Sequence, residues 1–164
     1  MNRTFFSDCI LLALSIFCSC SSDKTSLEDS SPQLFGVYRA DAGDAALGND
    51  CIVFTDADIV WFNPKTREIK FKKSDKIEAL PMDVSISVKT ATDTLFIITG
   101  NISSVVSKAY DDLVLYYNIT NGKYYLYDNY PDYWDREKTK QNADKRADGW
   151  NAFLKILRSQ GRIR

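Results

Sequence analysis

The sequence contains no histidine. Hydrolases that use a histidine base beside serine or cysteine are therefore excluded, and so is every metal site with a histidine ligand. The seven glycines are scattered, so no glycine-rich phosphate-binding loop is present. Catalysis by paired carboxylates is the main enzymatic chemistry that these absences leave open.

The charge and hydropathy of the sequence exclude further classes of protein. The formal net charge is −1, which argues against a nucleic-acid-binding surface, and no nucleic-acid partner is expected. No stretch after residue 20 approaches the roughly 20 apolar residues of a membrane-spanning helix. Hydrophobic residues make up 45% of the chain, far above a disordered composition, and 164 residues suit a single domain.

Residues 1–19 have the features of a bacterial lipoprotein signal peptide. A short positive region precedes the apolar segment Cys9–Phe17, which is too short to span a bilayer. Ser19 precedes Cys20, and this order resembles the bacterial lipobox, in which the cysteine becomes the lipid-modified N-terminus. We expect lipidation at Cys20, followed by a polar tether over residues 20–32. An ordinary cleaved signal peptide is the alternative.

The lipid would hold the protein at the outer membrane, on its periplasmic or cell-surface face, without a transmembrane helix. Ser21, directly after Cys20, resembles an outer-membrane sorting residue. Cys9 and Cys18 leave with the signal peptide, so no intramolecular disulfide is expected. Cys51 would be the one free thiol, and its place at the start of an apolar run predicts a small buried hydrophobic residue.

Residues 33–164 are predicted to form a single α+β domain, in which a mainly antiparallel β-sheet packs against a C-terminal amphipathic helix. Alternation of apolar and polar residues and the intervening turn residues delimit the strands. The predicted strands are Leu34–Tyr38, Cys51–Thr55, Ile59–Phe62, Glu68–Phe71, Val84–Val88, Thr94–Thr99, Leu113–Thr120 and Lys123–Asp128.

Asn121-Gly122 lies between the last two predicted strands and is the preferred pair for a two-residue type I′ hairpin turn. This turn fixes the register and assigns alternate side chains to a core face and an opposite face. The predicted pairs are Ile119 with Tyr124, Tyr117 with Leu126 and Leu115 with Asp128 on the core face, and Asn118 with Tyr125 and Tyr116 with Tyr127 on the opposite face.

A helix is predicted near the C-terminus because apolar residues recur there at helical spacing. The apolar stripe consists of Ala143, Ala147, Trp150, Leu154 and Leu157. Gly161 stands where a C-terminal cap is expected, and Gly149 marks a point where the helix can bend or break.

Charge is unevenly distributed along the chain. Residues 136–164 carry nine lysines and arginines against three acids, so the remainder is acidic. The basic element either complements the acidic body against which it packs or forms a docking face for phosphate, a lipid headgroup or an acidic partner.

Three segments, residues 58–71, 111–128 and 142–161, together with the lipobox, resemble small uncharacterised lipoproteins of gut Bacteroidales. The resemblance covers the chain from about residue 50 to its end. It implies a bacterial envelope origin and location, and it carries over no functional residue.

Acidic residues offer two candidate chemistries. Asp56 and Asp58 have the spacing of the first two ligands of a calcium loop, but Val60 stands at the next ligand position, so no metal or cofactor is expected. A carboxylate pair for glycoside hydrolysis needs no histidine. Its candidate members are Asp111, Asp112, Asp128, Asp132 and Asp135.

Aromatic residues offer a candidate ligand platform. Flat rings with hydroxyl tips suit a sugar or peptide surface because they combine apolar area with a polar group. The candidate platform consists of Tyr116, Tyr125, Tyr127, Tyr130, Tyr133 and Trp134. In the other interpretation the C-terminal helix covers this face, and the tyrosines form a second core layer.

These observations favour a non-enzymatic, lipid-anchored binding or accessory module of the cell envelope, with a glycan or an envelope protein as partner. Two alternatives stay open. One is a carboxylate-based glycoside hydrolase, and the other is a structural or inhibitor subunit that docks another envelope protein.

Lipidation can be tested directly by metabolic labelling with palmitate. We expect the wild-type chain to incorporate the label and Cys20→Ala to lose it, because the acyl chains are attached at this cysteine. Cys18→Ala serves as the control and should keep the label. Incorporation of palmitate by Cys20→Ala would refute the assignment.

Overall fold

A computed structural model of the chain describes residues 33–38 and 51–164; the predicted signal peptide, Cys20 and the tether lie outside the described residues. The elements, in chain order, are β1 (Phe35–Tyr38), β2 (Cys51–Thr55), the 3-10 turn η1 (Asp56–Asp58), β3 (Ile59–Phe62), β4 (Glu68–Phe71), α1 (Asp75–Glu78), β5 (Val84–Lys89), β6 (Thr94–Ser103), β7 (Val114–Asn118), β8 (Lys123–Tyr127), α2 (Arg136–Lys145) and α3 (Ala147–Ser159).

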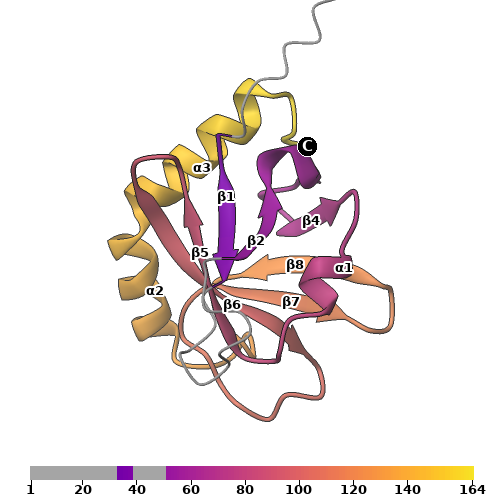
Figure 1. Cartoon of the computed structure of the whole chain (residues 1–164). Helices are drawn as coiled ribbons and strands as arrows, with labels where there is room; N and C mark the ends of the chain where they lie inside the picture. Colours follow the sequence, from indigo (N-terminus) through magenta and orange to yellow (C-terminus); the bar gives the residue numbers. More distant parts are fainter. Residues whose placement is uncertain (1–32, 39–50) are drawn as a thin grey trace, which may run out of the picture. The chain divides into compact units, whose positions relative to one another are not determined.

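The described strands form one eight-stranded sheet in the order β2-β1-β5-β6-β7-β8-β4-β3. All neighbouring pairs are antiparallel except β6 and β7, which run parallel. Figure 1 shows the sheet with the C-terminal helices along one side. The predicted α+β fold class is therefore confirmed. The predicted bounds of β2, β3 and β4 are also confirmed, whereas β6 continues past its predicted end to Ser103.

The predicted register of the β7–β8 hairpin is wrong by two residues. Asn118 pairs with Lys123 and Tyr117 with Tyr124, so four residues rather than two connect the strands. The Asn118 carbonyl accepts a hydrogen bond from the Gly122 amide at 2.8 Å, and Gly122 has a φ of 66° that favours glycine. A shift of two residues keeps the side chains of residues 114–118 and 123–127 on their predicted faces, because side chains alternate with period two. The core positions predicted for Ile119 and Asp128 are wrong: both lie outside the strands, and their side chains are 58% and 45% exposed.

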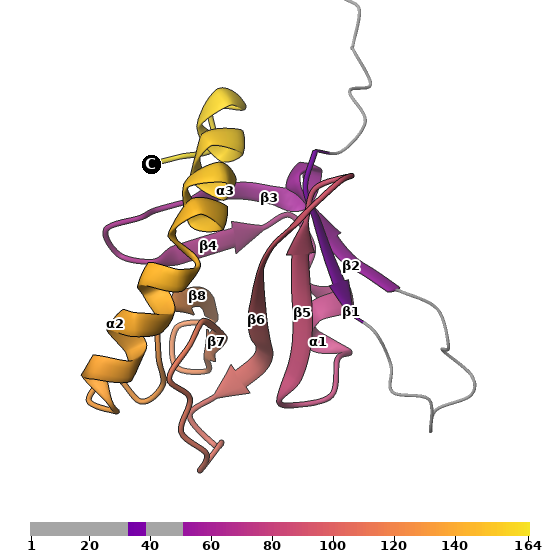
Figure 2. The same cartoon turned by 90° about the vertical axis from the view of Figure 1, so that its left-hand side faces the viewer.

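The C-terminal helix is a pair of helices rather than the single one predicted. The break lies at Arg146, between α2 and α3, and not at Gly149. Asp135 caps the start of α2 by accepting a hydrogen bond from the Lys138 amide at 3.0 Å. No residue of α2 is buried, so the apolar stripe belongs to α3, which packs along the sheet (Figure 2).

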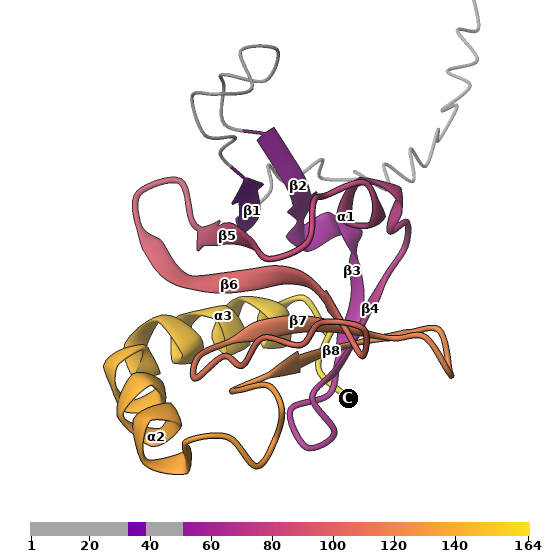
Figure 3. The same cartoon turned by 90° about the horizontal axis from the view of Figure 1, so that it is seen from below.

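The main core lies between α3 and the sheet. Phe153 of α3 is 5.7 Å from Phe62 and 5.5 Å from Phe96, measured between ring centroids. Figure 3 shows α3 running beside β6. A Cβ atom at Gly149 would overlap the carbonyl oxygen of Leu95 in β6, so glycine at this position lets the helix approach the strand closely. The glycine therefore serves packing rather than a helix break.

The end of α3 has the predicted glycine cap. Gly161 has a φ of 67°, its amide donates to the Arg158 carbonyl at 3.0 Å, and the Arg162 amide donates to the Leu157 carbonyl at 2.8 Å. These are the two hydrogen bonds of a Schellman motif. The chain then runs beside β3, where Phe62 and Ile163 form a parallel bridge.

Candidate ligand-binding site

Tyr116, Tyr125 and Tyr127 of the β7–β8 hairpin lie on the side of the sheet away from α3, whereas Tyr117 and Tyr124 pack in the main core. Leu115 and Leu126 are buried and line the same interior space as Phe153 of α3. Tyr116 and Tyr127 belong to the alternate positions of the same strands and are half-buried. The helix therefore packs on the face opposite these tyrosines, as the predicted face assignment required.

Four tyrosine rings form a continuous row, which we call the tyrosine row: Tyr125, Tyr127, Tyr116 and Tyr130. Tyr125 and Tyr127 are stacked with centroids 5.3 Å apart, as are Tyr116 and Tyr130 at 5.3 Å. Tyr116 and Tyr127 connect the two pairs at 5.7 Å. Because stacked rings cover one another's faces, the row offers a ligand mostly ring edges and hydroxyl groups.

Beneath the tyrosine row, buried apolar side chains form a small layer that is separate from the main core. Val114 and Ile102 are fully buried, and both share the face of Tyr116 by alternation and by strand pairing. Burial raises the pKa of the Tyr127 hydroxyl, and the nearby Tyr125, Tyr116 and Asp132 raise it further. The tyrosine row is thus partly desolvated and held in place from below.

The segment after β8 adds aromatic rings with free faces. Tyr130 is fixed by a backbone bridge to Tyr110. The side-chain amide of Asn129 donates a hydrogen bond to the Trp134 carbonyl at 2.9 Å. Tyr133 is 73% exposed and Trp134 is 47% exposed. Within the described residues, neither ring packs against another aromatic ring. These two rings, rather than the tyrosine row, can stack on a ligand.

A pocket of about 490 Å³ lies between the tyrosine row and this segment. Its wall combines ring surface with amide, carboxylate and guanidinium groups. The lining residues are Arg67, Tyr116, Asn118, Tyr127, Asp128, Asn129, Tyr130, Pro131 and Asp132. A ligand that has both apolar faces and several hydroxyl or amide groups fits such a wall.

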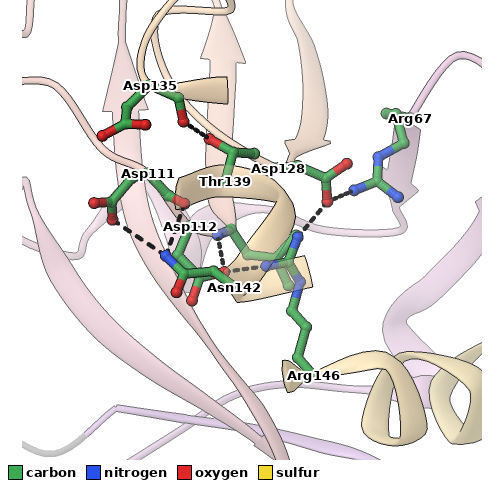
Figure 4. A network of polar contacts seen from close by, with 9 residues as sticks. Arg67, Asp111, Asp112, Asp128, Asp135, Thr139, Asn142 and Arg146 are labelled. Carbon is green, nitrogen blue, oxygen red and sulfur yellow. Dashed lines mark hydrogen bonds and ion pairs between the residues drawn. The ribbon is translucent and has the colours of Figure 1, made fainter. Parts of the chain in front are cut away.

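Asp128 is the best-anchored polar group of the pocket. One of its oxygens, Oδ1, accepts hydrogen bonds from the guanidinium groups of both Arg67 and Arg146, the latter at 2.5 Å (Figure 4). Arg146 is buried at the junction of α2 and α3, and its other nitrogen pairs with Asp112. The carboxylate is consequently oriented by two cations that come from different parts of the chain.

Arg67 connects the pocket with the main core. Its guanidinium lies 4.4 Å from the ring centroid of Trp150 in α3, and its backbone has a φ of 63°. Burial lowers the pKa of this arginine, although the adjacent Asp128 opposes the change. Its Nε atom is buried and has no hydrogen-bond partner among the described residues. No motif in the sequence marks Arg67 or Arg146 as part of a site.

Only some of the five candidate hydrolase carboxylates lie near one another in the structure. Asp111 accepts from the Asn142 side chain through its carbonyl at 3.0 Å and pairs with Lys138, while Asp112 and Asp128 share Arg146. Asp132 lines the pocket, and Asp135 caps α2. Glycoside hydrolysis requires one carboxyl that carries a proton. Asp112 and Asp128 are instead engaged by guanidinium groups.

The predicted calcium-like spacing has a structural role in the fold. Asp56 is buried and accepts hydrogen bonds from the Leu34 amide at 3.3 Å and from the Gln160 side chain. Asp58 accepts from the amide and hydroxyl of Thr55 at 2.8 and 2.9 Å. In the described part of the chain, no three acidic or cysteine side chains gather as a metal site would require.

The prediction that Cys51 is buried is wrong. Cys51 is exposed and has a free thiol. It is the first residue of β2, which lies at an edge of the sheet, and the core contacts of this strand begin two residues later at Val53. The apolar run that follows Cys51 enters the core, but the cysteine itself does not.

The sequence matches no family model, and it matches no curated protein and no solved structure. Across residues 33–38 and 51–164, no helix has the length and apolar character needed to cross a bilayer. The resemblance to lipoproteins of gut Bacteroidales thus stays a prediction.

Removal of the Arg146 side chain should destabilise the protein. In Arg146→Gln, Asp112 loses its guanidinium partner and Asp128 loses one of two, and we expect the free energy of unfolding to fall by about 1–3 kcal/mol. Chemical denaturation measures this change. The neighbouring Lys145→Gln, at an exposed position, is the control and should change stability by less than about 0.5 kcal/mol. Equal losses in both variants would contradict this role of Arg146.

Proposed function

We propose that the protein is a lipid-anchored binding module of the cell envelope that holds a carbohydrate in the pocket beside the tyrosine row. The observation that carries the proposal is a pocket that has fixed polar side chains and is followed along the chain by free aromatic rings. Asp128 lines the pocket and is oriented by two arginines, while Tyr133 and Trp134, which directly follow the lining residue Asp132, are exposed.

The chemistry of a sugar ring fits this arrangement. One face of a pyranose presents C–H groups that stack on an aromatic ring, and its rim presents hydroxyl groups that donate to carboxylates and amide oxygens. Asp128, Asn118 and Asn129 provide such acceptors in the pocket wall. Because Asp128 is already oriented by Arg67 and Arg146, little ordering of the site is needed on binding.

Binding rather than hydrolysis is favoured by the contacts of the carboxylates. Asp128 is held by two guanidinium groups, whereas Asp132 is exposed and, among the residues that the structure describes, no contact fixes its carboxylate to a catalytic partner. A glycosidase needs two carboxyl groups with different protonation states on either side of one bond. The docking-subunit alternative has no specific contact in its favour.

Substitution of the free rings should weaken carbohydrate binding without affecting the fold. We expect Trp134→Ala and Tyr133→Ala each to raise the Kd about tenfold, since one stacking contact of about 1–1.5 kcal/mol is lost. Binding of soluble cello-, chito- and malto-oligosaccharides can be measured by titration calorimetry, together with thermal melts. Exposed substitutions of this kind should leave the Tm nearly unchanged.

Met82→Ala is the matched control, because Met82 is 62% exposed and belongs neither to the pocket wall nor to the segment after β8 that carries Tyr133 and Trp134. It should bind as the wild type does. Absence of binding to every oligosaccharide in the panel, or unchanged binding by both ring variants, would contradict the proposed site. Release of shorter sugars during the titration, detected by chromatography, would contradict the non-enzymatic role.

A further inference from the structure

Gln33 and Leu34, which precede β1, lie beside the end of α3. The backbone amides of Gln33 and Leu34 donate to Oδ1 of Asp56 at 3.1 and 3.3 Å. The side chain of Gln160, directly after α3, donates to Oδ2 of the same carboxylate. One buried aspartate therefore holds together the point where the chain enters the domain and the point where its last helix ends.

Exposed charge at this end of the domain is mainly positive, although Asp75, two residues after Lys73, is also exposed. Lys155, Arg158 and Arg164 are exposed, and no acid occurs between residue 149 and the C-terminus. Lys72 and Lys73 are also exposed, and the Lys72 amide donates to the carbonyl of Asp58 in η1 at 2.8 Å. We call these five cations the basic end.

Asp56 and Asp58, the two acids of η1 at the basic end, form hydrogen bonds within the fold. Asp56 is buried and bonded to Leu34 and Gln160, while Asp58 accepts two hydrogen bonds from Thr55. Arg162 donates to the carbonyls of Asp56 and Ile59, the second at 2.5 Å, so it is engaged within the fold. The basic end therefore does not find its counter-charge in these acids.

The predicted lipid attachment places this end near a bilayer. Residues 20–32 separate the basic end from Cys20, and a chain of 13 residues reaches at most about 45 Å. The views in Figures 1 and 2 place the start of β1 and the end of α3 at one pole of the domain, and α2 with the segment before it toward the other.

We propose that the basic end is a docking surface for an anionic phospholipid bilayer. This inference rests on the lipid-anchored part of the proposed function and is independent of the carbohydrate pocket. Lysines and arginines beside an anionic leaflet attract its phosphate groups, and such a surface adds to the binding that acyl chains provide. The acyl chains fix the protein to the membrane, and the basic end sets its orientation.

Vesicle co-sedimentation tests the docking surface without the lipid. The chain from residue 20 with Cys20→Ser contains the whole compact unit of residues 31–164. We expect it to bind vesicles of 30% phosphatidylglycerol in phosphatidylcholine and not vesicles of phosphatidylcholine alone. Binding should weaken as salt rises, because surface charges are screened.

The variant Lys155→Gln/Arg158→Gln should bind these anionic vesicles about 25-fold more weakly, at roughly fivefold for each cation near the leaflet. The matched control is Lys140→Gln/Lys145→Gln, which removes two exposed cations from α2. The control should keep wild-type affinity within about twofold. Circular dichroism verifies that both variants are folded, as expected for exposed substitutions.

Three results would overturn the proposal. They are equal losses in the two double variants, binding to phosphatidylcholine vesicles as strong as to anionic ones, and no binding of the parent chain to anionic vesicles. None of these results bears on the carbohydrate pocket, and palmitate labelling reports on Cys20 separately. Failure of the docking surface is therefore distinguishable from failure of the proposed function.

Discussion

The packing of α3 against β6 determines which face of the sheet is left uncovered. Phe153 packs between Phe62 and Phe96, and Gly149 allows the helix backbone to approach the strand. A sheet has two faces, and side chains alternate between them. Because the helix takes the face of Leu126, the neighbouring Tyr127 and its row are left on the other face.

The candidate pocket is connected to this core through ion pairs rather than apolar contacts. Asp128 lines the pocket and is held by Arg67, whose guanidinium lies over Trp150 of α3. Arg146 adds the second contact from the α2–α3 junction. Since α2 buries no side chain, polar contacts of this kind hold it to the domain. The pocket wall, the helix junction and the core therefore share one network.

Local patterns predicted the strands well because burial of one face imposes alternation on each strand. The turn of the β7–β8 hairpin was predicted wrongly, since the structure places Tyr117 opposite Tyr124 and closes a wider loop at Asn118. The parallel pairing of β6 with β7, two consecutive strands, depends on the path of the connection between Ser103 and Val114, which alternation within a strand does not indicate. Arg67 and Arg146 were not predicted as site residues, because an ion pair between residues 61 or 18 positions apart produces no periodic pattern in the sequence.

The central claim is that the tyrosine row faces solvent while α3 occupies the opposite side of the sheet. Solvent paramagnetic relaxation in NMR, with a soluble gadolinium chelate, measures this for each ring. The account predicts strong relaxation of the ring protons of Tyr125 and Tyr127 and weak relaxation of those of Phe153 and Phe62. Tyrosine rings as protected as Phe153 would contradict it, because the helix or another part of the chain would then cover the proposed binding face.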